Sequence, residues 1–333
     1  MNLFNLGELN WRQTQLIYHA LAYKNIEGLV LDSSKNRYVC VSLHQNPRDE
    51  LDIDYCKKNK IGIFRREIGG GIVLLDNDQI FYNLIINRNH PKVPYAPDNF
   101  FRKFLQPVIQ TYNELGISVE FRPLCDLIVD GKKISGNGGG EIGECKVLAG
   151  SILLDFDYKL MAQLMLLPNG IQKKFLELMQ NNLTTVKKEL GFIPLKKNIC
   201  SILATKFENL IGPFTNRRID SEINKKMIEL NKQYSTDNWL YQRGTKQIGK
   251  EVKIREGVFL FYNLFNTQKG SVESTFEIKD NKVKKVTFSN SKILSHIAKK
   301  KLLDKFVGQK YDKDNLVNEI TELIINNGVI NGA

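Results

Sequence analysis

The residues best suited to chemistry begin with two arginines and three glycines in one short run. Arg65 and Arg66 precede Gly69–Gly71, and an apolar stretch then ends at Asp76. Consecutive glycines let the backbone take positive φ angles and let another group approach the main chain. Free N–H groups in such a bend suit phosphate oxygens, and guanidinium groups bind phosphate or carboxylate in a bidentate manner. The run predicts an anion site; a glycine-rich turn with surface arginines is the simpler alternative.

A second run carries an aspartate, a lysine and further glycines. Asp130-Gly131 separates two apolar stretches, which is a strong signal for a hairpin. Asp126 precedes this turn, Lys133 follows it, and residues 136–144 are dense in glycine. We expect residues 136–144 to form a mobile loop that orders on ligand binding. Together the two runs offer backbone donors, arginines and a lysine for a phosphate-bearing ligand.

Strands and helices must position these runs. Residues 61–64 and 72–75 are apolar and β-like, so the three glycines are expected to join two strands. This excludes a P-loop and a Gly-x-Gly-x-x-Gly dinucleotide motif, both of which open a helix. Helices are expected at 11–23, behind Asn10 as N-cap, and at 98–115.

Composition and patterning predict a globular protein with two domains. The chain has 333 residues, of which 42% are hydrophobic and 25% charged. Helical patterns lead up to residue 236; from 240 the pattern changes to four strands, followed by helices at 292–306 and 314–325. We expect an α+β fold, with a large domain at 1–236, built from mixed β-sheets and packed helices, and a small domain at 240–331.

The net charge of +12 attracts anionic ligands and acidic partners, although a lysine-rich proteome would explain it equally well. Basic and aromatic residues do not alternate as in single-strand binders, so no nucleic acid is expected. No apolar run is long enough for a membrane span, and no secretory signal is visible. The five cysteines are scattered and odd in number, which argues against disulfides and zinc and favours a cytoplasmic protein.

Taken together, the two runs resemble the lipoate–protein ligase A family, within the biotin and lipoate protein ligase superfamily. The resemblance rests on Arg-Arg-x-x-Gly-Gly-Gly, four apolar residues and Asp at 65–76, and on Asp-Leu-Ile-Val-Asp-Gly-Lys-Lys-Ile-Ser-Gly at 126–136. Gly150-Ser151, ahead of further apolar residues, also fits the family's spacing. The resemblance covers about residues 10–170, and the tail from about 240 resembles the family's accessory domain.

This resemblance implies that ATP and Mg²⁺ activate lipoate as lipoyl-AMP and that the lipoyl group then passes to a lysine of an acceptor. Negative charge develops on oxygens in both steps, and fixed donors stabilise it. Lys133 matches the motif lysine that bridges the α-phosphate and the lipoyl carboxylate. The residues matching the ATP site are Arg66, Gly71, Ile72, Val73, Leu74 and Lys133, and those matching the lipoate site are Lys133, Gly70, Gly71 and Val73.

Asp126 is a candidate either for holding Mg²⁺ through water or for orienting Lys133, and a turn-capping aspartate is the alternative. No metal site is predicted with confidence from His or Cys. The implied acceptor is an acidic lipoyl domain, from a 2-oxoacid dehydrogenase E2 component, a glycine cleavage H protein or a dedicated lipoyl carrier.

Departures from the family pattern leave the acyl substrate and the acceptor open. Ile68, Leu75 and Gln79 stand where Ser, His and Asn are usual, and a run from Asn137 replaces a Ser-Ala run.

Two alternatives remain. An octanoyl or lipoyl transferase would need an activated cysteine near Lys133, for which Cys125 or Cys145 is available. A basic, non-enzymatic nucleic-acid binder would show strongly salt-dependent binding. The Arg66-to-Gly71 motif and the accessory domain favour the ligase.

Overall fold

The computed structural model describes residues 1–242, 250–267, 270–288, 300, 303–312, 315–319 and 322. The chain divides into two compact units, and both are discontinuous in sequence. The first is Met1–Leu167 with Met179–Thr245, and the second is Pro168–Leu178 with Lys246–Ala333. Helix α7 (Asn169–Asn182) is therefore divided between the two units. No helix among the described residues is long and apolar enough to cross a membrane.

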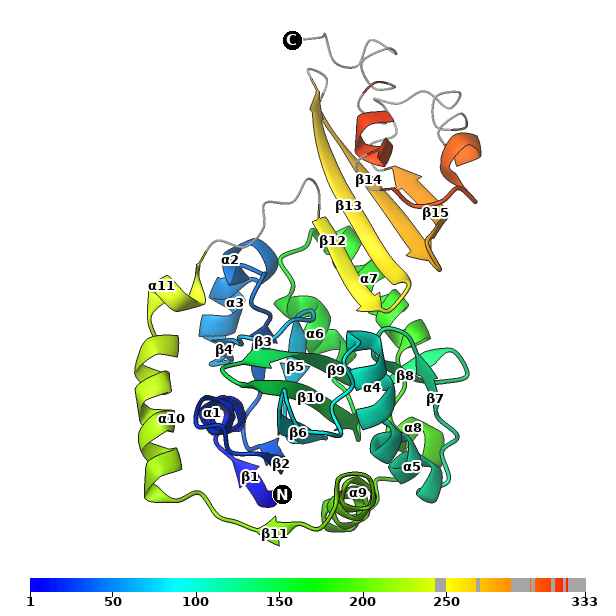
Figure 1. Cartoon of the computed structure of the whole chain (residues 1–333). Helices are drawn as coiled ribbons and strands as arrows, with labels where there is room; N and C mark the ends of the chain where they lie inside the picture. The colour runs from blue at the N-terminus through cyan, green and yellow to red at the C-terminus, as the bar shows by residue number, and fades with distance from the viewer. Residues whose placement is uncertain are drawn as a thin grey trace. The chain divides into compact units, whose positions relative to one another are not determined.

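The first unit is built on an eight-stranded mixed sheet (Figure 1). Strand β1 pairs in parallel with β2 and β11, and the remaining pairs are antiparallel. In spatial order the strands are β11 (Thr215–Asn216), β1 (Asn2–Leu9), β2 (Gly28–Ser34), β6 (Gln79–Asn87), β10 (Cys145–Leu153), β9 (Lys132–Ile142), β8 (Asp126–Val129) and β7 (Glu120–Arg122). This is the mixed α+β architecture that the sequence predicts.

Helices cover both faces of this sheet. Side chains alternate along a strand, so Leu29 and Leu31 enter one core while Val30 enters the other. The first core is closed by α4 (Pro97–Phe104), α5 (Gln106–Glu114) and α9 (Lys196–Ile211), and the second by α1 (Trp11–Tyr23) and α10 (Ser221–Tyr234). The shorter helices are α2 (Pro47–Glu50), α3 (Ile53–Lys58), α6 (Tyr158–Leu164), α8 (Val186–Leu190) and α11 (Asp237–Leu240).

Local sequence signals account for the helix boundaries. Asn10 caps α1 in a capping box with Gln13, which confirms the helix predicted at 11–23. The single helix predicted at 98–115 is instead two helices, α4 and α5. Pro107 lies at the start of α5, and its ring nitrogen cannot donate the hydrogen bond that would continue α4.

A separate three-stranded sheet holds the three glycines. Its order is β4 (Gly62–Arg65), β3 (Tyr38–Val41) and β5 (Val73–Leu75), with β3 parallel to β4 and antiparallel to β5. The glycine run crosses from β4 to β5 past β3. The prediction that it joins two strands is confirmed.

The prediction of a mobile loop at 136–144 is wrong. Residues 136–142 belong to β9, and all of them pair with β10. The glycines are needed because neighbours lie close: a Cβ at Gly139 would come within 2.7 Å of the Val147 carbonyl oxygen, and one at Gly138 within 3.0 Å of the Gly69 carbonyl oxygen. Glycine here indicates close packing rather than flexibility.

The second unit contains an antiparallel sheet in chain order. Its strands are β12 (Lys250–Arg255), β13 (Val258–Thr267), β14 (Gly270–Lys279) and β15 (Lys282–Phe288), which confirms the four predicted strands. Phe261 and Phe276 form its core with Phe306 and Leu316. The helices predicted at 292–306 and 314–325 lie largely outside the described residues; 303–306 and 315–319 are helical.

Candidate functional site

The hairpin that carries Lys133 forms as predicted. Asp130 and Gly131 both have positive φ, of 47° and 75°, as a two-residue primed turn requires. The turn sets β9 beside β8, and Lys133 Nζ lies 2.7 Å from Asp126 Oδ1. The main chain of Lys133 is fixed as well, because its carbonyl oxygen accepts a 2.8 Å hydrogen bond from the Thr184 N–H.

Lys133 and Asp126 form an ion pair that is largely withdrawn from water. Their side chains are 17% and 2% exposed, so Lys133 is not a solvent-exposed hairpin lysine. Of the two roles predicted for Asp126, the contact fits the orientation of Lys133. No group of three or more His, Cys, Asp or Glu side chains able to hold a metal ion occurs within the described residues.

The three-glycine loop folds around the guanidinium group of Arg66. Its Nη2 donates to the carbonyl oxygens of Gly69, at 3.1 Å, and Gly71, at 2.8 Å, while Nη1 donates to the Cys40 carbonyl oxygen at 3.3 Å. Gly70 has a φ of +116°, and a Cβ there would lie 2.7 Å from Arg66 Nη2, so only glycine fits without strain. The loop also reaches β9, because the Gly69 N–H donates to the Gly139 carbonyl oxygen at 3.3 Å.

The outward side of this loop offers donors. Within the described part of the chain, the N–H groups of Gly70 and Gly71 have no protein acceptor. Gly70 is exposed and Gly71 half-buried. Arg66 turns the loop's carbonyl oxygens toward itself, and the two amides remain available to an anion.

Arg65 and Arg66 are buried cations that form no ion pair with a carboxylate of the described residues. Their exposed fractions are 2% and 7%. Arg65 donates to two carbonyl oxygens, those of Leu43 and, at 2.5 Å, Gln242, and burial lowers its pKa. Burying a charge without a counter-charge costs free energy, which an anionic ligand nearby would offset.

The aspartate that closes the first run lies in a protected position. Asp76 is 4% exposed, and its pKa is raised to about 6 by burial and by the negative charge of Asp78. Gln79 donates through Nε2 to the Leu74 carbonyl oxygen at 2.9 Å, so this departure from the family pattern secures the end of β5.

Only one of the two candidate cysteines is fully buried. Cys145 is buried, burial raises the pKa of its thiol to about 11, and its Sγ donates to Asn25 Oδ1 at 3.4 Å. Cys125 Sγ donates to the carbonyl oxygen of Asn137 at 3.5 Å. A nucleophilic cysteine needs a lowered pKa, so the raised pKa of Cys145 argues against this residue as the thioester nucleophile.

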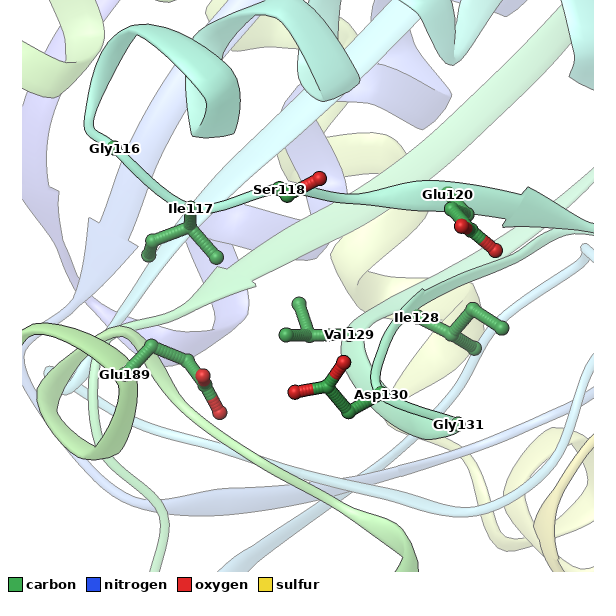
Figure 2. A pocket seen from close by; sticks show the side chains of 9 residues that line it. All are labelled: Gly116, Ile117, Ser118, Glu120, Ile128, Val129, Asp130, Gly131 and Glu189. Carbon is green, nitrogen blue, oxygen red and sulfur yellow. The ribbon is translucent and has the colours of Figure 1, made fainter.

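A surface pocket of about 310 Å³ lies at the outer end of the hairpin and is not the predicted site. Figure 2 shows the carboxylates of Asp130 and Glu189 pointing into it, with Glu120 on the neighbouring strand. Three carboxylates repel phosphate. The lining residues are Gly116, Ile117, Ser118, Glu120, Ile128, Val129, Asp130, Gly131 and Glu189.

Sequence reasoning missed the groups that fasten the arginine motif. Glu67 accepts hydrogen bonds from the hydroxyls of Tyr23 and Tyr234, and the Trp239 indole N–H donates to the Arg65 carbonyl oxygen at 2.9 Å. Tyr234 lies 167 residues from Glu67 along the chain, so no local spacing reveals the contact.

Comparison with known proteins agrees with this fold. The model of the lipoyl protein ligase A/B catalytic domain matches residues 7–208, more than half of the chain. The chain belongs to the lipoyl protein ligase A/B family, which confirms the resemblance.

The relatives of this chain include lipoate-protein ligases and octanoyltransferases. A probable lipoate-protein ligase A of Mycoplasma pneumoniae is 26% identical over 282 residues, covering 82% of this chain and 76% of its own. An octanoyltransferase LipM of Geobacillus kaustophilus is 26% identical over 160 residues, covering 41% of this chain and 57% of its own.

Two solved structures share the fold of about three quarters of this chain. A bi-partite lipoate protein ligase from Thermoplasma acidophilum, studied with its E2 lipoyl domain, gives a TM-score of 0.65 at 21% identity, with 74% of this chain and 98% of that chain covered. A lipoate-protein ligase A bound with ATP gives 0.61 at 21% identity, with 72% and 98% covered.

Proposed function

We propose that this protein is an ATP-dependent lipoate–protein ligase. It activates lipoate as lipoyl-AMP with release of pyrophosphate, and it transfers the lipoyl group to a lysine of an acceptor domain. In this proposal the domain predicted at 1–236 is catalytic and the domain predicted at 240–331 is accessory, although Pro168–Leu178 belongs to the second compact unit. The observation that carries the proposal is the pair of buried arginines without a carboxylate partner among the described residues, next to a loop with open amides.

The position of Lys133 supports an elongated ligand. Lys133 and Gly139, which touches the glycine loop, lie on the same strand six residues apart. At roughly 3.4 Å per residue, this separation is about 20 Å. The Lys133 side chain reaches across part of this distance, and a ligand such as an acyl chain joined to a nucleotide can span the remainder. ATP in the solved relative supports the choice of nucleotide.

Each predicted residue has a role in this proposal. Lys133, held by Asp126, contacts the α-phosphate and the lipoyl carboxylate and stabilises the charge that develops in both steps. Mg²⁺ is the metal that would accompany the triphosphate. Arg66 shapes the loop and contacts the nucleotide. The main chain of Gly71, Ile72, Val73 and Leu74 lies along ATP, and Gly70, Gly71 and Val73 border lipoate.

The acceptor we propose is an acidic lipoyl domain, since the chain carries a net charge of +12. An E2 lipoyl domain accompanies one structurally similar ligase. The location we propose is the cytoplasm, because all five cysteines are free thiols.

The test is pyrophosphate release that depends on both ATP and free lipoate. Lys133→Ala should lower the rate by at least about a hundredfold, as loss of a fixed charge at developing oxyanions does. Lys132→Ala is the matched control, because Lys132 is the preceding residue and is exposed. Cys125→Ala should keep the activity.

The octanoyltransferase relatives make acyl transfer between carrier proteins the second candidate. No pyrophosphate release, together with acyl transfer from a carrier protein that is lost in Cys125→Ala, would establish that reaction and contradict the ligase.

A further inference from the structure

The end of the first unit closes over the arginine motif. The Tyr234 hydroxyl at the end of α10 donates to Glu67 Oε1, and the Trp239 Nε1–H in α11 donates to the Arg65 carbonyl oxygen at 2.9 Å. Arg65 returns a hydrogen bond, from Nη1 to the Gln242 carbonyl oxygen, at 2.5 Å. Residues 234–242 are thus fastened to the motif in both directions.

Aromatic packing gives this closure a defined geometry. The Trp239 ring stacks on the Tyr234 ring with centroids 4.8 Å apart. Tyr234 meets the rings of Phe64, at 5.6 Å, and His19, at 5.3 Å, edge to face. Tyr234 is buried, so its hydroxyl has a fixed direction toward Glu67.

Glu67 is held by its main chain as well as its side chain. Its N–H donates to His19 Nε2 at 3.2 Å, and His19 Nδ1 donates to the Gln15 carbonyl oxygen at 2.7 Å. This pattern requires a neutral ring, and burial lowers the pKa of His19 to about 4, so the ring is neutral near pH 7. The Tyr23 hydroxyl bonds both carboxylate oxygens, at 2.9 and 2.8 Å.

The residue next to Glu67 is Arg66, whose guanidinium group shapes the loop at Gly69–Gly71. We propose that Tyr234 and Trp239 are positioning residues for nucleotide activation. Tyr234 acts through Glu67, and Trp239 acts through the main chain of Arg65. Both keep Arg66 and the loop in the shape that receives phosphate. A loop that is already ordered binds without paying the ordering entropy.

This inference rests on the proposed function, and its test measures the KM for ATP in lipoate-dependent pyrophosphate release. Tyr234→Phe removes only a hydroxyl, and we expect the KM for ATP to rise about tenfold and to rise more than the KM for lipoate, which the same loop also borders. Trp239→Phe should raise the KM for ATP less, by about threefold. Ile228→Ala, at an exposed position of the same helix, is the control and should leave both KM values unchanged.

A double-mutant cycle separates positioning from general support of the fold. If Tyr234 acts through Glu67, Tyr234→Phe adds nothing to the KM of Glu67→Ala. Full additivity of the two changes would overturn the inference, as would a Tyr234→Phe enzyme with a lower Tm and kcat but an unchanged KM for ATP. A wild-type protein without pyrophosphate release would remove the proposed function and this inference with it; an active wild type with an unaffected Tyr234→Phe would remove this inference alone.

Discussion

Two segments of this protein each consist of three consecutive glycines and have different structures. Gly69–Gly71 is a loop whose middle residue has a φ of +116° and which folds around Arg66. Gly138–Gly140 lies in the paired strand β9, where neighbours leave no room for a Cβ. In the first segment glycine is needed for its positive φ angle, and in the second it is needed because a Cβ atom would be too close to its neighbours. A glycine run therefore predicts that other atoms approach the backbone closely. Whether the run forms a loop or a strand depends on the neighbouring group, which is the Arg66 side chain in the first segment and strand β10 in the second.

The largest effect that separates the two segments should come from Gly139→Ala. Its Cβ would lie 2.7 Å from the Val147 carbonyl oxygen and 3.1 Å from the Phe101 ring, so the strand pair must shift. We expect the free energy of unfolding to fall by about 3 kcal/mol, in the upper range for overpacking. Urea unfolding measures it. An unchanged midpoint would mean that β9 is as adaptable as a loop.

Charge also distinguishes the two segments. The run that contains Gly69–Gly71 ends at the buried carboxyl group of Asp76. Its folded-state pKa of about 6 exceeds the usual value of 3.8, so its contribution to stability is complete below pH 4 and is lost as pH rises through 6. Two pKa units correspond to about 3 kcal/mol. Asp76→Asn should therefore lose less stability between pH 4 and 7 than the wild type, as measured by urea unfolding at both pH values.

The control for this prediction is Asp78→Asn, which removes a neighbouring negative charge and should move the loss of stability to lower pH. Parallel stability curves for the wild type and Asp76→Asn would contradict the assignment.

Gly70→Ala should affect the ligand site more than the fold. The substitution is strained by the φ of +116° and by the Arg66 Nη2 atom 2.7 Å from the new Cβ. We expect a loss of about 1 kcal/mol in the free energy of unfolding and a clear rise in the KM for ATP. A stability loss as large as that of Gly139→Ala would erase the contrast between the segments.

Gly71→Ala should have the smallest effect on stability, below about 0.5 kcal/mol, because nothing lies within 4 Å of its Cβ position. If ATP or lipoate approaches this backbone, the same methyl group should still weaken binding. Calorimetric titrations with ATP and with lipoate measure the two affinities. Undiminished affinity for both ATP and lipoate would show that neither ligand occupies the open space beside Gly71.

Short-range signals in the sequence account for much of this fold. Asn10 with Gln13 determines the start of α1, and Asp130-Gly131 determines the turn that brings Lys133 to Asp126. These features depend on residues a few positions apart. Pro107, which divides the helix predicted at 98–115, is a further local signal, because its ring nitrogen cannot donate the hydrogen bond that would continue α4.

The features that could not be predicted depend on distant parts of the chain. Whether the glycines after Ser135 form a strand depends on β10 and the loop at Gly69. The fastening of Glu67 depends on Tyr234, and the partners of Arg65 are the carbonyl oxygens of Leu43 and Gln242, which carry no side-chain signature. Backbone acceptors are the same in every residue, so a sequence cannot reveal them.

The division of helix α7 between the two units has a practical consequence for dissecting the protein. The chain passes between the units at Leu167–Pro168, Leu178–Met179 and Thr245–Lys246. A fragment that starts at residue 246 would lack Lys174, which pairs with Glu277 at 2.7 Å inside the same unit. The remaining fragment would keep a helix whose first turns had lost their packing partner. Cutting the gene at one point therefore yields two incomplete pieces, and a clean separation requires grafting Pro168–Leu178 onto the C-terminal piece.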